Sequence, residues 1–476
     1  MNSSRIEMPL GPRHPRLRPV ARLAQRLSAL AMAGALAFAA APAEAQQRPM
    51  KIIRDAEIER LLMDYAQPLF RAAGIGSSGA EIIIIQDNSF NAFVASGNRM
   101  FINTGALLEA QTPNEIIGVI AHETGHLAGG HLQNLRNEMA RAQAIGAIAS
   151  ILSAGAVVAG AATGTADLGR GGAAAMTLGP SVAMRSLLSY RRAQEIAADR
   201  AALTYLNATG QSAKGMITTF RKFADQALFA SQYVDPYVQS HPMPRERLAQ
   251  LEAAAAKSSH WEATDPASLQ LRHDMMRAKI SAFTESPGRV ARRFPSSQKT
   301  LPTAYANAIL AYRTGGLRSA IGQIDGLIRS DPRNPYFHEL KGQALLESGK
   351  AAEAIGPLRQ AQSLAPNAGL IRILLGHALL ETGRNDLLDE AIGNLRAGLT
   401  SEPLASLGYR HLANAYARQG RIGEAELATA RGLLIEGQVE AAKSYARRVQ
   451  GKVKRGSPEW VQADDIISYQ APDTDS

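Results

Sequence analysis

The sequence TPNEIIGVIAHETGH occupies residues 112–126 and decides much of the fold. Thr112, Pro113 and Glu115 match the N-cap, N1 and N3 positions of a helix, which together form a capping box. The apolar residues that follow have no polar face, so the helix is predicted to be largely buried. The stretch therefore predicts a well-defined, buried helix that carries two histidines into the interior.

His122 and His126 are spaced i and i+4, so their imidazoles project from one face of this helix and can chelate one metal ion. Glu123 is rotated by about 100° and is predicted to reach a metal-bound water without ligating the ion. This HExxH spacing is typical of zinc peptidases, in which the Glu acts as general base. The alternative is a buried, hydrogen-bonded histidine pair.

A third ligand is needed to complete such a site. His131 is one residue too early for a third helical ligand, because position 132 is Leu. On a continued helix His131 would lie about 180° from His122, which favours a surface or packing histidine. Glu195 and Asp199, i and i+4 in a second helical stretch, supply the alternative. We expect Glu195 to bind the metal and Asp199 to orient a ligand histidine through a hydrogen bond.

Short β-branched segments precede the HETGH helix. Residues 82–85, 90–94 and 99–102 read as strands separated by turns rich in Asp, Asn, Ser and Gly. They predict a small antiparallel sheet. The last strand is the expected edge at which an extended substrate pairs through main-chain hydrogen bonds. Its residues are Arg99, Met100, Phe101 and Ile102.

The C-terminal third of the chain is repetitive. Gly315, Gly349 and Gly383 are 34 residues apart, and so are Pro332 and Pro366. This period and the small residues within it resemble the tetratricopeptide repeat, a helical hairpin that stacks into a solenoid. About four repeats are predicted, roughly over residues 301–436.

The composition excludes several kinds of chemistry. The 476 residues include no cysteine, so disulfides, thiolate nucleophiles, cysteine-ligated metals and cysteine-linked lipid anchors are excluded. Any metal site must use His and carboxylate ligands. With 20% charged and 46% hydrophobic residues, the chain is neither disordered throughout nor collagen-like. Its length suggests two or three domains.

Residues 1–45 are predicted to be a cleaved secretory signal peptide. Arginines precede an uncharged apolar run that ends in Ala43-Glu44-Ala45, an A-x-A cleavage pattern. The alternative is a membrane anchor, for which the run is short. These residues include six Arg and two Glu, so cleavage lowers the net charge from +10 to +6. The lower charge weakens the argument that the protein binds nucleic acid. The remaining charge suits a protein beside an anionic membrane.

Residues 142–166 form a second uncharged segment, 25 residues long and therefore long enough to span a bilayer. Alanine and glycine dominate it, and Ile, Leu and Val are few. Such a weakly apolar run favours a soluble helix or flap near the active site. A membrane-embedded protein is the alternative.

Further motifs follow the order of a known family: FNAF at 90–93, NTGAL at 103–107, HETGH, EIAAD at 195–199 and SHP at 240–242. On these motifs the chain resembles the M48 family of zinc metallopeptidases. Its nearest type within that family is the secreted bacterial branch with C-terminal tetratricopeptide repeats, the beta-barrel assembly-enhancing type. The resemblance implies one Zn²⁺ per chain held by His122, His126 and Glu195. Glu123 would be the base, with Asp199 behind the ligands.

The resemblance also brings in His241 and Arg247, since a later His and an Arg six residues on approach the metal in such enzymes. Two roles for His241 are open. It stabilises the oxyanion together with Arg247, or it occupies the fourth zinc position and keeps the resting enzyme latent. The alternative for both residues is a turn histidine and an arginine on a surface helix.

The predicted fold is an α+β, zincin-like catalytic domain of the gluzincin type, mostly helical with a small antiparallel sheet, followed by an all-α repeat solenoid. The expected divisions are a signal peptide (1–45), the peptidase domain (46–255), a helical linker (256–300), the repeats (301–450) and an irregular tail (451–476).

The resemblance implies a periplasmic zinc endopeptidase, in peripheral contact with the outer membrane, that acts on misfolded or misassembled outer-membrane proteins. The repeats would bind clients or the barrel assembly machinery. No nucleic acid is expected. The alternative function is a chaperone or assembly scaffold with little proteolysis, although such a protein would have no need for Glu123.

Overall fold

The computed structural model describes residues 50–76, 80–95, 97–141, 143–144, 166–229, 237 and 240–470. The predicted signal peptide lies outside them, as does residue 142 and the run 145–165 of the uncharged segment. Within the described ranges, no helix is both long and apolar enough to cross a membrane.

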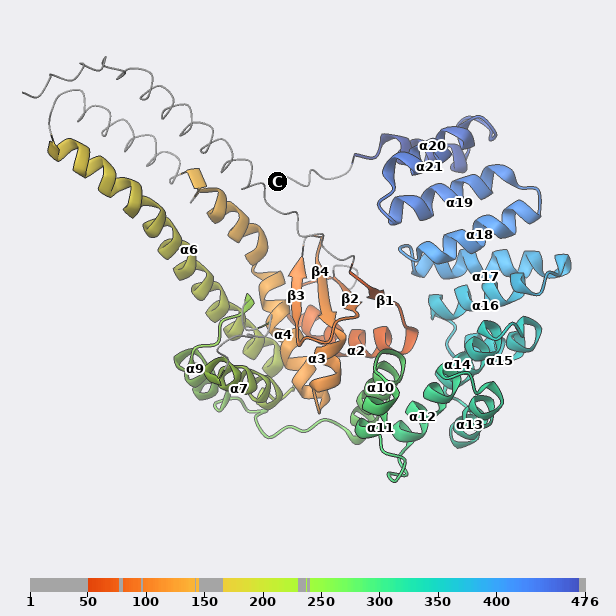
Figure 1. The fold of residues 1–476 in the computed structure, drawn as a ribbon, viewed down its shortest axis with the longest axis horizontal. Coiled ribbons are helices and arrows are strands. Elements are labelled where there is room, and N and C mark those ends of the chain that lie inside the picture. The colour runs from red at the N-terminus through yellow and green to blue at the C-terminus, as the bar shows by residue number, and fades with distance from the viewer. Residues whose placement is uncertain are drawn as a thin grey trace, which may run out of the picture. The chain divides into compact units, whose positions relative to one another are not determined.

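A four-stranded sheet forms one layer of the N-terminal half, in the order β1-β2-β4-β3 (Figure 1). Its strands are β1 (Ile52–Ile53), β2 (Glu81–Ile85), β3 (Ala92–Ala95) and β4 (Arg99–Asn103). β1 pairs with β2 and β3 with β4 in antiparallel fashion, whereas β2 and β4 are parallel. The sheet is therefore mixed, and the prediction of a wholly antiparallel sheet was wrong.

The turn before β3 explains this topology. The backbone N–H of Gly105, just after β4, donates to the Asp87 carbonyl at 2.8 Å, and the Thr104 hydroxyl donates to the same oxygen at 2.9 Å. A Cβ on Gly105 would lie 2.3 Å from the Ser89 carbonyl oxygen, so only glycine permits this contact. The turn thus ties the end of β2 to the end of β4, and β3 lies on the outside.

The strand predicted as the sheet edge is consequently internal. In β4, Ile102 pairs with Ile84 on one side and Ala92 on the other, so its main-chain groups are already used. The prediction that Arg99, Met100, Phe101 and Ile102 form an edge was wrong. Among the described strands the edges are β1 and β3, and β3 packs against the HETGH helix.

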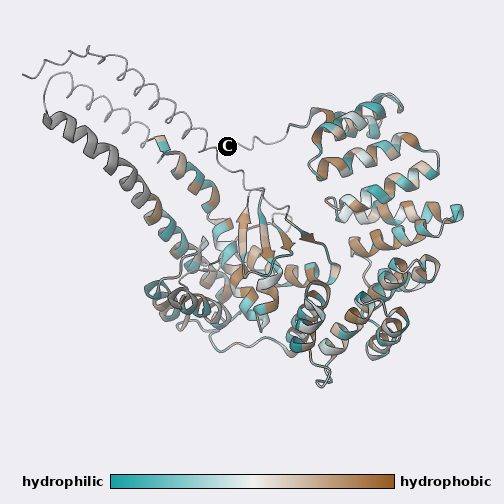
Figure 2. Cartoon of the chain, in the orientation of Figure 1, coloured by the Kyte–Doolittle hydropathy of each residue, from teal (hydrophilic) through white to brown (hydrophobic). Residues whose placement is uncertain are grey.

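The HETGH helix is α4 (Pro113–Ala128). The Thr112 hydroxyl accepts from the Glu115 N–H, one of the donors left free at the helix start. The Glu115 carboxylate accepts from the N–H of Gln111, the residue before the N-cap, at 3.3 Å. Almost every residue from Pro113 to His126 is buried. Figure 2 shows hydrophobic residues along the strands of the neighbouring sheet. The predicted buried helix is present.

Two helices approach α4 closely at glycines. A Cβ on Gly118 would lie 2.6 Å from the Cβ of Met216 in α7 (Lys214–Phe229). A Cβ on Gly125 would lie 2.8 Å from the Ala198 carbonyl of α6 (Ala166–Ala208), which runs beside α4 in Figure 1. This half also contains α2 (Ala56–Ala72), α3 (Thr104–Glu109) and α9 (Arg245–Ala255), and residues 131–141 are helical as well. The close approach brings the side chains of α6 within reach of the two histidines.

Helices α10 (Ala267–Thr284) and α11 (Pro287–Arg293) connect this half to the repeats. Lys279 of α10 is buried and pairs with Asp55 at 2.7 Å and Glu57 at 3.2 Å at the start of α2. The Tyr305 hydroxyl of the first repeat helix donates to Glu57 at 2.9 Å. A buried charged cluster therefore joins α2, α10 and the first repeat.

The repeats are antiparallel helix pairs. They comprise α12 (Leu301–Arg313), α13 (Leu317–Ser330), α14 (Pro335–Glu347), α15 (Ala351–Leu364), α16 (Gly369–Glu381), α17 (Leu388–Ser401), α18 (Ser406–Arg418) and α19 (Ile422–Ile435). Gly315, Gly349 and Gly383 follow the first helix of successive pairs with φ of 88°, 76° and 72°. The glycines recur every 34 residues because each first helix ends at a residue with left-handed backbone conformation, which favours glycine.

The C-terminal segment is more ordered than expected. After α20 (Val439–Gln450), residues predicted to be irregular form α21 (Pro458–Ser468), which begins where the Ser457 hydroxyl accepts from the Trp460 N–H at 3.2 Å. Ala463 and Ile466 are buried in a small core shared with α19 and α20. The prediction of an irregular tail was wrong for these eleven residues.

Candidate metal centre

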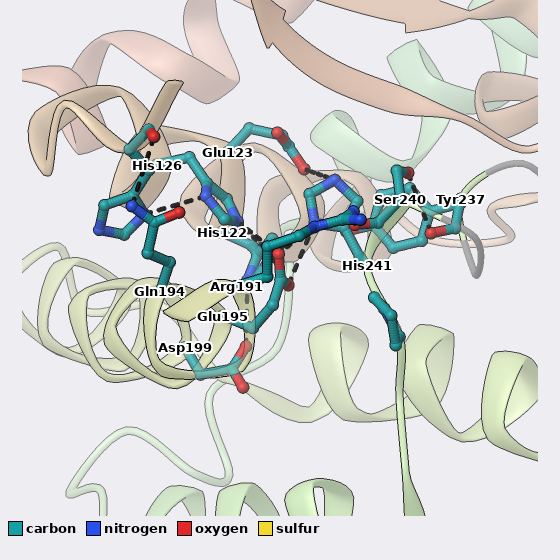
Figure 3. Close-up of polar contacts among 12 residues, drawn as sticks. His122, Glu123, His126, Arg191, Gln194, Glu195, Asp199, Tyr237, Ser240 and His241 are labelled. Atoms are coloured by element: carbon teal, nitrogen blue, oxygen red, sulfur yellow. Dashed lines mark hydrogen bonds and ion pairs between the residues drawn. The ribbon is translucent and has the colours of Figure 1, made fainter. Parts of the chain in front are cut away.

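Three side chains predicted as metal ligands meet between α4 and α6 (Figure 3). The Nε2 atoms of His122 and His126 are 3.1 Å apart. Glu195, from α6, lies with Oε2 3.4 Å from His122 Nε2 and Oε1 3.5 Å from His126 Nε2. All three residues are buried. The i, i+4 pair of one helix and one carboxylate of the next thus point at a common centre.

His241 joins this group from the segment before α9. Its Nδ1 lies 3.1 Å from Glu195 Oε2 and 3.4 Å from His122 Nε2. Its backbone N–H donates to the Tyr237 carbonyl at 2.7 Å, and Arg191 of α6 donates to the Ser240 carbonyl at 3.1 Å. The prediction of an isolated turn histidine does not describe this position.

Glu123 lies beside the cluster and not within it. The side chain is fully buried, and its Oε1 is 3.5 Å from His241 Nε2. Burial raises the pKa of the Glu123 carboxyl, since the charged form loses its hydration. A carboxyl with a raised pKa, close to the ligands but separate from them, is suited to proton transfer.

Asp199 and Arg247 hold the ligands from behind. Asp199 Oδ1 is 3.0 Å from His122 Nδ1, the nitrogen that faces away from the cluster. The Arg247 guanidinium donates to both oxygens of Asp199, at 2.6 and 2.8 Å. Burial by itself raises the pKa of Asp199, but hydrogen bonds from Arg247 and His122 outweigh it and hold the pKa below its usual value. Asp199 therefore remains a carboxylate that fixes the His122 ring.

Arg247 is buried, so the alternative of a surface arginine was wrong. Its third nitrogen, Nη1, lies 3.0 Å from Glu195 Oε2 and donates to the Pro242 carbonyl at 2.9 Å. All three guanidinium nitrogens thus contact protein acceptors. This arrangement favours alignment of Glu195 and Asp199 over direct contact with a substrate oxyanion.

The pKa values of the two helix histidines are shifted in opposite directions because their partners differ. Burial lowers the pKa of His122, but hydrogen bonds to Asp199 and Glu195 outweigh burial and raise it to about 9. Burial lowers the pKa of His126 to about 3. Burial raises the pKa of Glu195, but hydrogen bonds from His122, His126 and His241 hold it well below its usual value.

The donor set fits a divalent metal ion. One atom each from His122, His126, Glu195 and His241 can be chosen so that all four lie within 4.8 Å of one another. The Nε2 atoms of His122 and His126 lie 3.1 Å apart, so a hydrogen bond between them uses the lone pair of only one nitrogen. A bound cation would interact with the lone pairs of both nitrogens and with the Glu195 carboxylate. Imidazole nitrogen and carboxylate oxygen are ligands that zinc accepts.

His131 is a residue whose position the sequence reasoning missed. The helix does not continue to it, because α4 ends at Ala128 and Gly130 has a φ of 59°. The chain turns, and His131 Nδ1 comes to 3.0 Å from His126 Nδ1. The dipeptide Gly129-Gly130, which follows HETGH after Leu127 and Ala128, is the signal that indicated a helix end.

Tyr237 was also missed. It is fully buried, and its ring lies 4.6 Å from that of His241, at an interplanar angle of 31°. Phe220 and Phe223 of α7 contact the same ring. The i, i+4 spacing of Tyr237 and His241 was the available signal. The aromatic packing sets the direction from which His241 enters the cluster.

Comparison with known proteins assigns two parts of the chain to families. Residues 53–255 match the profile of peptidase family M48. These residues form an M48 peptidase domain. Residues 305–369 and 373–447 match the tetratricopeptide repeat. All the side chains of the metal centre lie within the M48 domain.

Several relatives share both parts. The beta-barrel assembly-enhancing protease of Escherichia coli (strain K12) is 23% identical over 418 residues, which cover 85% of this chain and 81% of the relative. Its Yersinia pestis namesake is 24% identical over 395 residues, covering 80% and 76%. A solved structure, MamA MSR-1 C2, covers 35% of this chain and 93% of its own at 21% identity, with a TM-score of 0.30.

Proposed function

We propose that the M48 domain is a zinc-dependent endopeptidase. The convergence of His122, His126 and Glu195 at one point, with the buried Glu123 next to it, is the observation that carries this proposal. His122, His126 and Glu195 would hold the zinc ion, which when bound lowers the pKa of a water molecule and polarises a peptide carbonyl. A structural metal site would not require the adjacent buried carboxylate.

Different residues of this chain would then have different roles in hydrolysis. Glu123 takes a proton from the attacking water and passes it to the leaving amine, which its raised pKa favours. Asp199 and Arg247 hold His122 and Glu195 in place. The substrate is an extended chain that pairs with the outer edge of β3, which among the described strands is an edge strand and packs against α4.

The substitution Glu123→Gln tests this function. We expect the full-length mature chain to lose cleavage of casein or an unfolded client by at least about 10³-fold, with its zinc content unchanged, because the residue is a base and not a ligand. Glu440→Gln, at a side chain that is 82% exposed, is the matched control and should keep full activity. Equal cleavage by Glu123→Gln and wild type would eliminate the hydrolase and favour the chaperone or scaffold.

We infer that the resting enzyme is closed by His241. Its Nδ1 lies among the ligand atoms, within 3.4 Å of His122 Nε2 and 3.1 Å of Glu195 Oε2, in the place that substrate and water need. A histidine in this fourth position would block hydrolysis until a client displaces it. The guanidinium of Arg247 is already occupied, which leaves the oxyanion role with less support.

His241→Ala tests latency. We expect casein cleavage to rise several-fold, while zinc is retained by the three remaining ligands. His338→Ala, in the repeat helix α14, serves as the control for losing a histidine and should behave as wild type. If His241→Ala leaves cleavage unchanged or lower, the latency proposal is wrong.

The proposed cellular role is that of a periplasmic enzyme that degrades misfolded or misassembled outer-membrane proteins. The N-terminal signal pattern supports the location, and the relatives' name, beta-barrel assembly-enhancing protease, supports a protease linked to barrel assembly. The repeats are proposed to bind clients or the barrel assembly machinery, with the protein peripheral to the membrane. Crosslinking from the repeats of the full-length chain in cells would identify the partner; capture of barrel proteins or their assembly machinery is the expected result.

A further inference from the structure

The segment directly after α4 is built to return a histidine to the metal centre. Gly129 caps the helix, and Gly130 adopts a φ of 59°, a conformation that favours glycine. A Cβ on Gly129 would lie 2.4 Å from Nε2 of His131. Only glycine at 129 therefore leaves room for the His131 imidazole above the end of α4.

The returning imidazole reaches one specific atom. His131 Nδ1 lies 3.0 Å from His126 Nδ1, with the two rings at 83° to each other. The other nitrogen of His126, Nε2, faces His122 Nε2 at 3.1 Å and Glu195 Oε1 at 3.5 Å. His126 thus presents one nitrogen to the donor cluster and the other to His131.

This geometry determines where the protons lie when the site is filled. A neutral imidazole carries one proton, so a His126 that binds a metal through Nε2 must carry its proton on Nδ1. That N–H needs an acceptor in a buried place, and His131 Nδ1 is at hydrogen-bond distance. His131 must then keep its own proton on Nε2.

The two histidine ligands of α4 therefore differ in the group that contacts their outward-facing nitrogen. The outward nitrogen of His122 meets a carboxylate, Asp199, which Arg247 holds in turn. The outward nitrogen of His126 meets an imidazole. Gln194, next to the ligand Glu195 in α6, donates to the His131 carbonyl at 3.3 Å and anchors the returning segment to the same helix.

We propose that His131 is a positioning residue that fixes the tautomer and ring orientation of His126 as a metal ligand. The proposal rests on the proposed function, because it requires that the cluster bind zinc. His131 does not itself bind the ion; its role is to accept a hydrogen bond at Nδ1.

Two substitutions separate that role from simple packing. In Asn the Oδ1 atom occupies the place of histidine Nδ1, whereas in Gln the Oε1 atom reaches the place of Nε2. The full-length mature chain of each variant is stripped of metal, and its dissociation constant for zinc is measured by competition with a chelator. We expect His131→Asn to bind zinc within about threefold of wild type and His131→Gln to bind about tenfold more weakly.

Gly129→Ala provides an independent route to the same loss. Its Cβ would displace the His131 ring while leaving His131 itself unchanged, so zinc binding should weaken as in His131→Gln. Thermal unfolding of the metal-free variants checks that each one folds. Equal zinc affinity of His131→Gln and wild type, or equal losses in His131→Asn and His131→Gln, would overturn the proposal. Failure of the wild-type chain to bind zinc would instead overturn the proposed function.

Discussion

The contact between α4 and α6 in the M48 domain and the contact between α14 and α15 in the repeats use the same device for different purposes. In each pair a glycine lets two helices approach. A Cβ on Gly125 would meet the backbone of Ala198, at 2.8 Å from its carbonyl oxygen. A Cβ on Gly342 would meet the side chain of Leu358, at 2.4 Å from its Cγ.

What the helices bury differs. Between α4 and α6 lie the charged and ionisable side chains of the metal centre, all of them nearly inaccessible to solvent. The buried side chains that α14 and α15 contribute to their shared core are Leu and Ala, among them Leu345, Ala354 and Leu358. Burying charge costs free energy unless every group is paired. The contact between α4 and α6 therefore lowers the stability of the fold, but it holds the ligands in fixed positions. The apolar contact between α14 and α15 avoids this cost. Three substitutions test the difference between the two contacts.

The largest expected effect is at Arg247. Arg247→Met removes the guanidinium that pairs with two buried carboxylates, Asp199 and Glu195, and leaves them with histidine partners alone. We expect the free energy of unfolding to fall by about 3–5 kcal/mol. Urea denaturation, followed by the fluorescence of Trp261 in a Trp460→Phe background, reports on the M48 domain.

The matched control for this prediction is Arg272→Met. Arg272 pairs with Asp64 at 2.6 Å, but its side chain is 46% exposed, so water screens the pair. The loss should stay below about 1 kcal/mol. If the two variants lost similar amounts of unfolding free energy, the buried network would contribute no more to stability than an exposed ion pair.

An intermediate effect is expected at Gly125. In Gly125→Ala the new methyl group meets backbone atoms of Ala198, which cannot move without shifting α6 and the ligand Glu195. We expect about 1–3 kcal/mol of destabilisation and a clear loss of zinc affinity. Chelator competition on the metal-free protein measures the affinity. If Gly125→Ala bound zinc as tightly as wild type, the idea that Gly125 sets the position of the ligand Glu195 would be wrong.

The parts of the site whose arrangement in space was predicted depend on local spacing. The cap at Thr112, the i, i+4 pair of His122 and His126 and the pair of Glu195 and Asp199 are fixed by the geometry of single helices. The repeat hairpins were predictable for the same reason, since their glycines recur at a fixed period.

The parts that were missed depend on contacts between distant segments or on one backbone angle. β4 lies inside the sheet because the turn at Asp87 binds the residues after β4, which no strand pattern reveals. His131 reaches His126 because of the φ of Gly130. The helix α21 is short, and its apolar residues acquire a partner only when α19 and α20 are in place.

The smallest effect is expected at Gly342, and it completes the comparison. In Gly342→Ala the three atoms nearest to the new methyl group all belong to the Leu358 side chain, which can change its rotamer, so we expect about 1 kcal/mol of destabilisation. Zinc affinity should not change, because no ligand lies on α14. Gly356→Ala, in α15, is the control: nothing lies within 4 Å of its Cβ, and alanine favours a helix, so stability should rise slightly. Thermal unfolding monitored by circular dichroism measures both. A loss of zinc binding in Gly342→Ala would mean that the repeats and the metal centre are coupled, and the separation drawn between the two interfaces would be wrong.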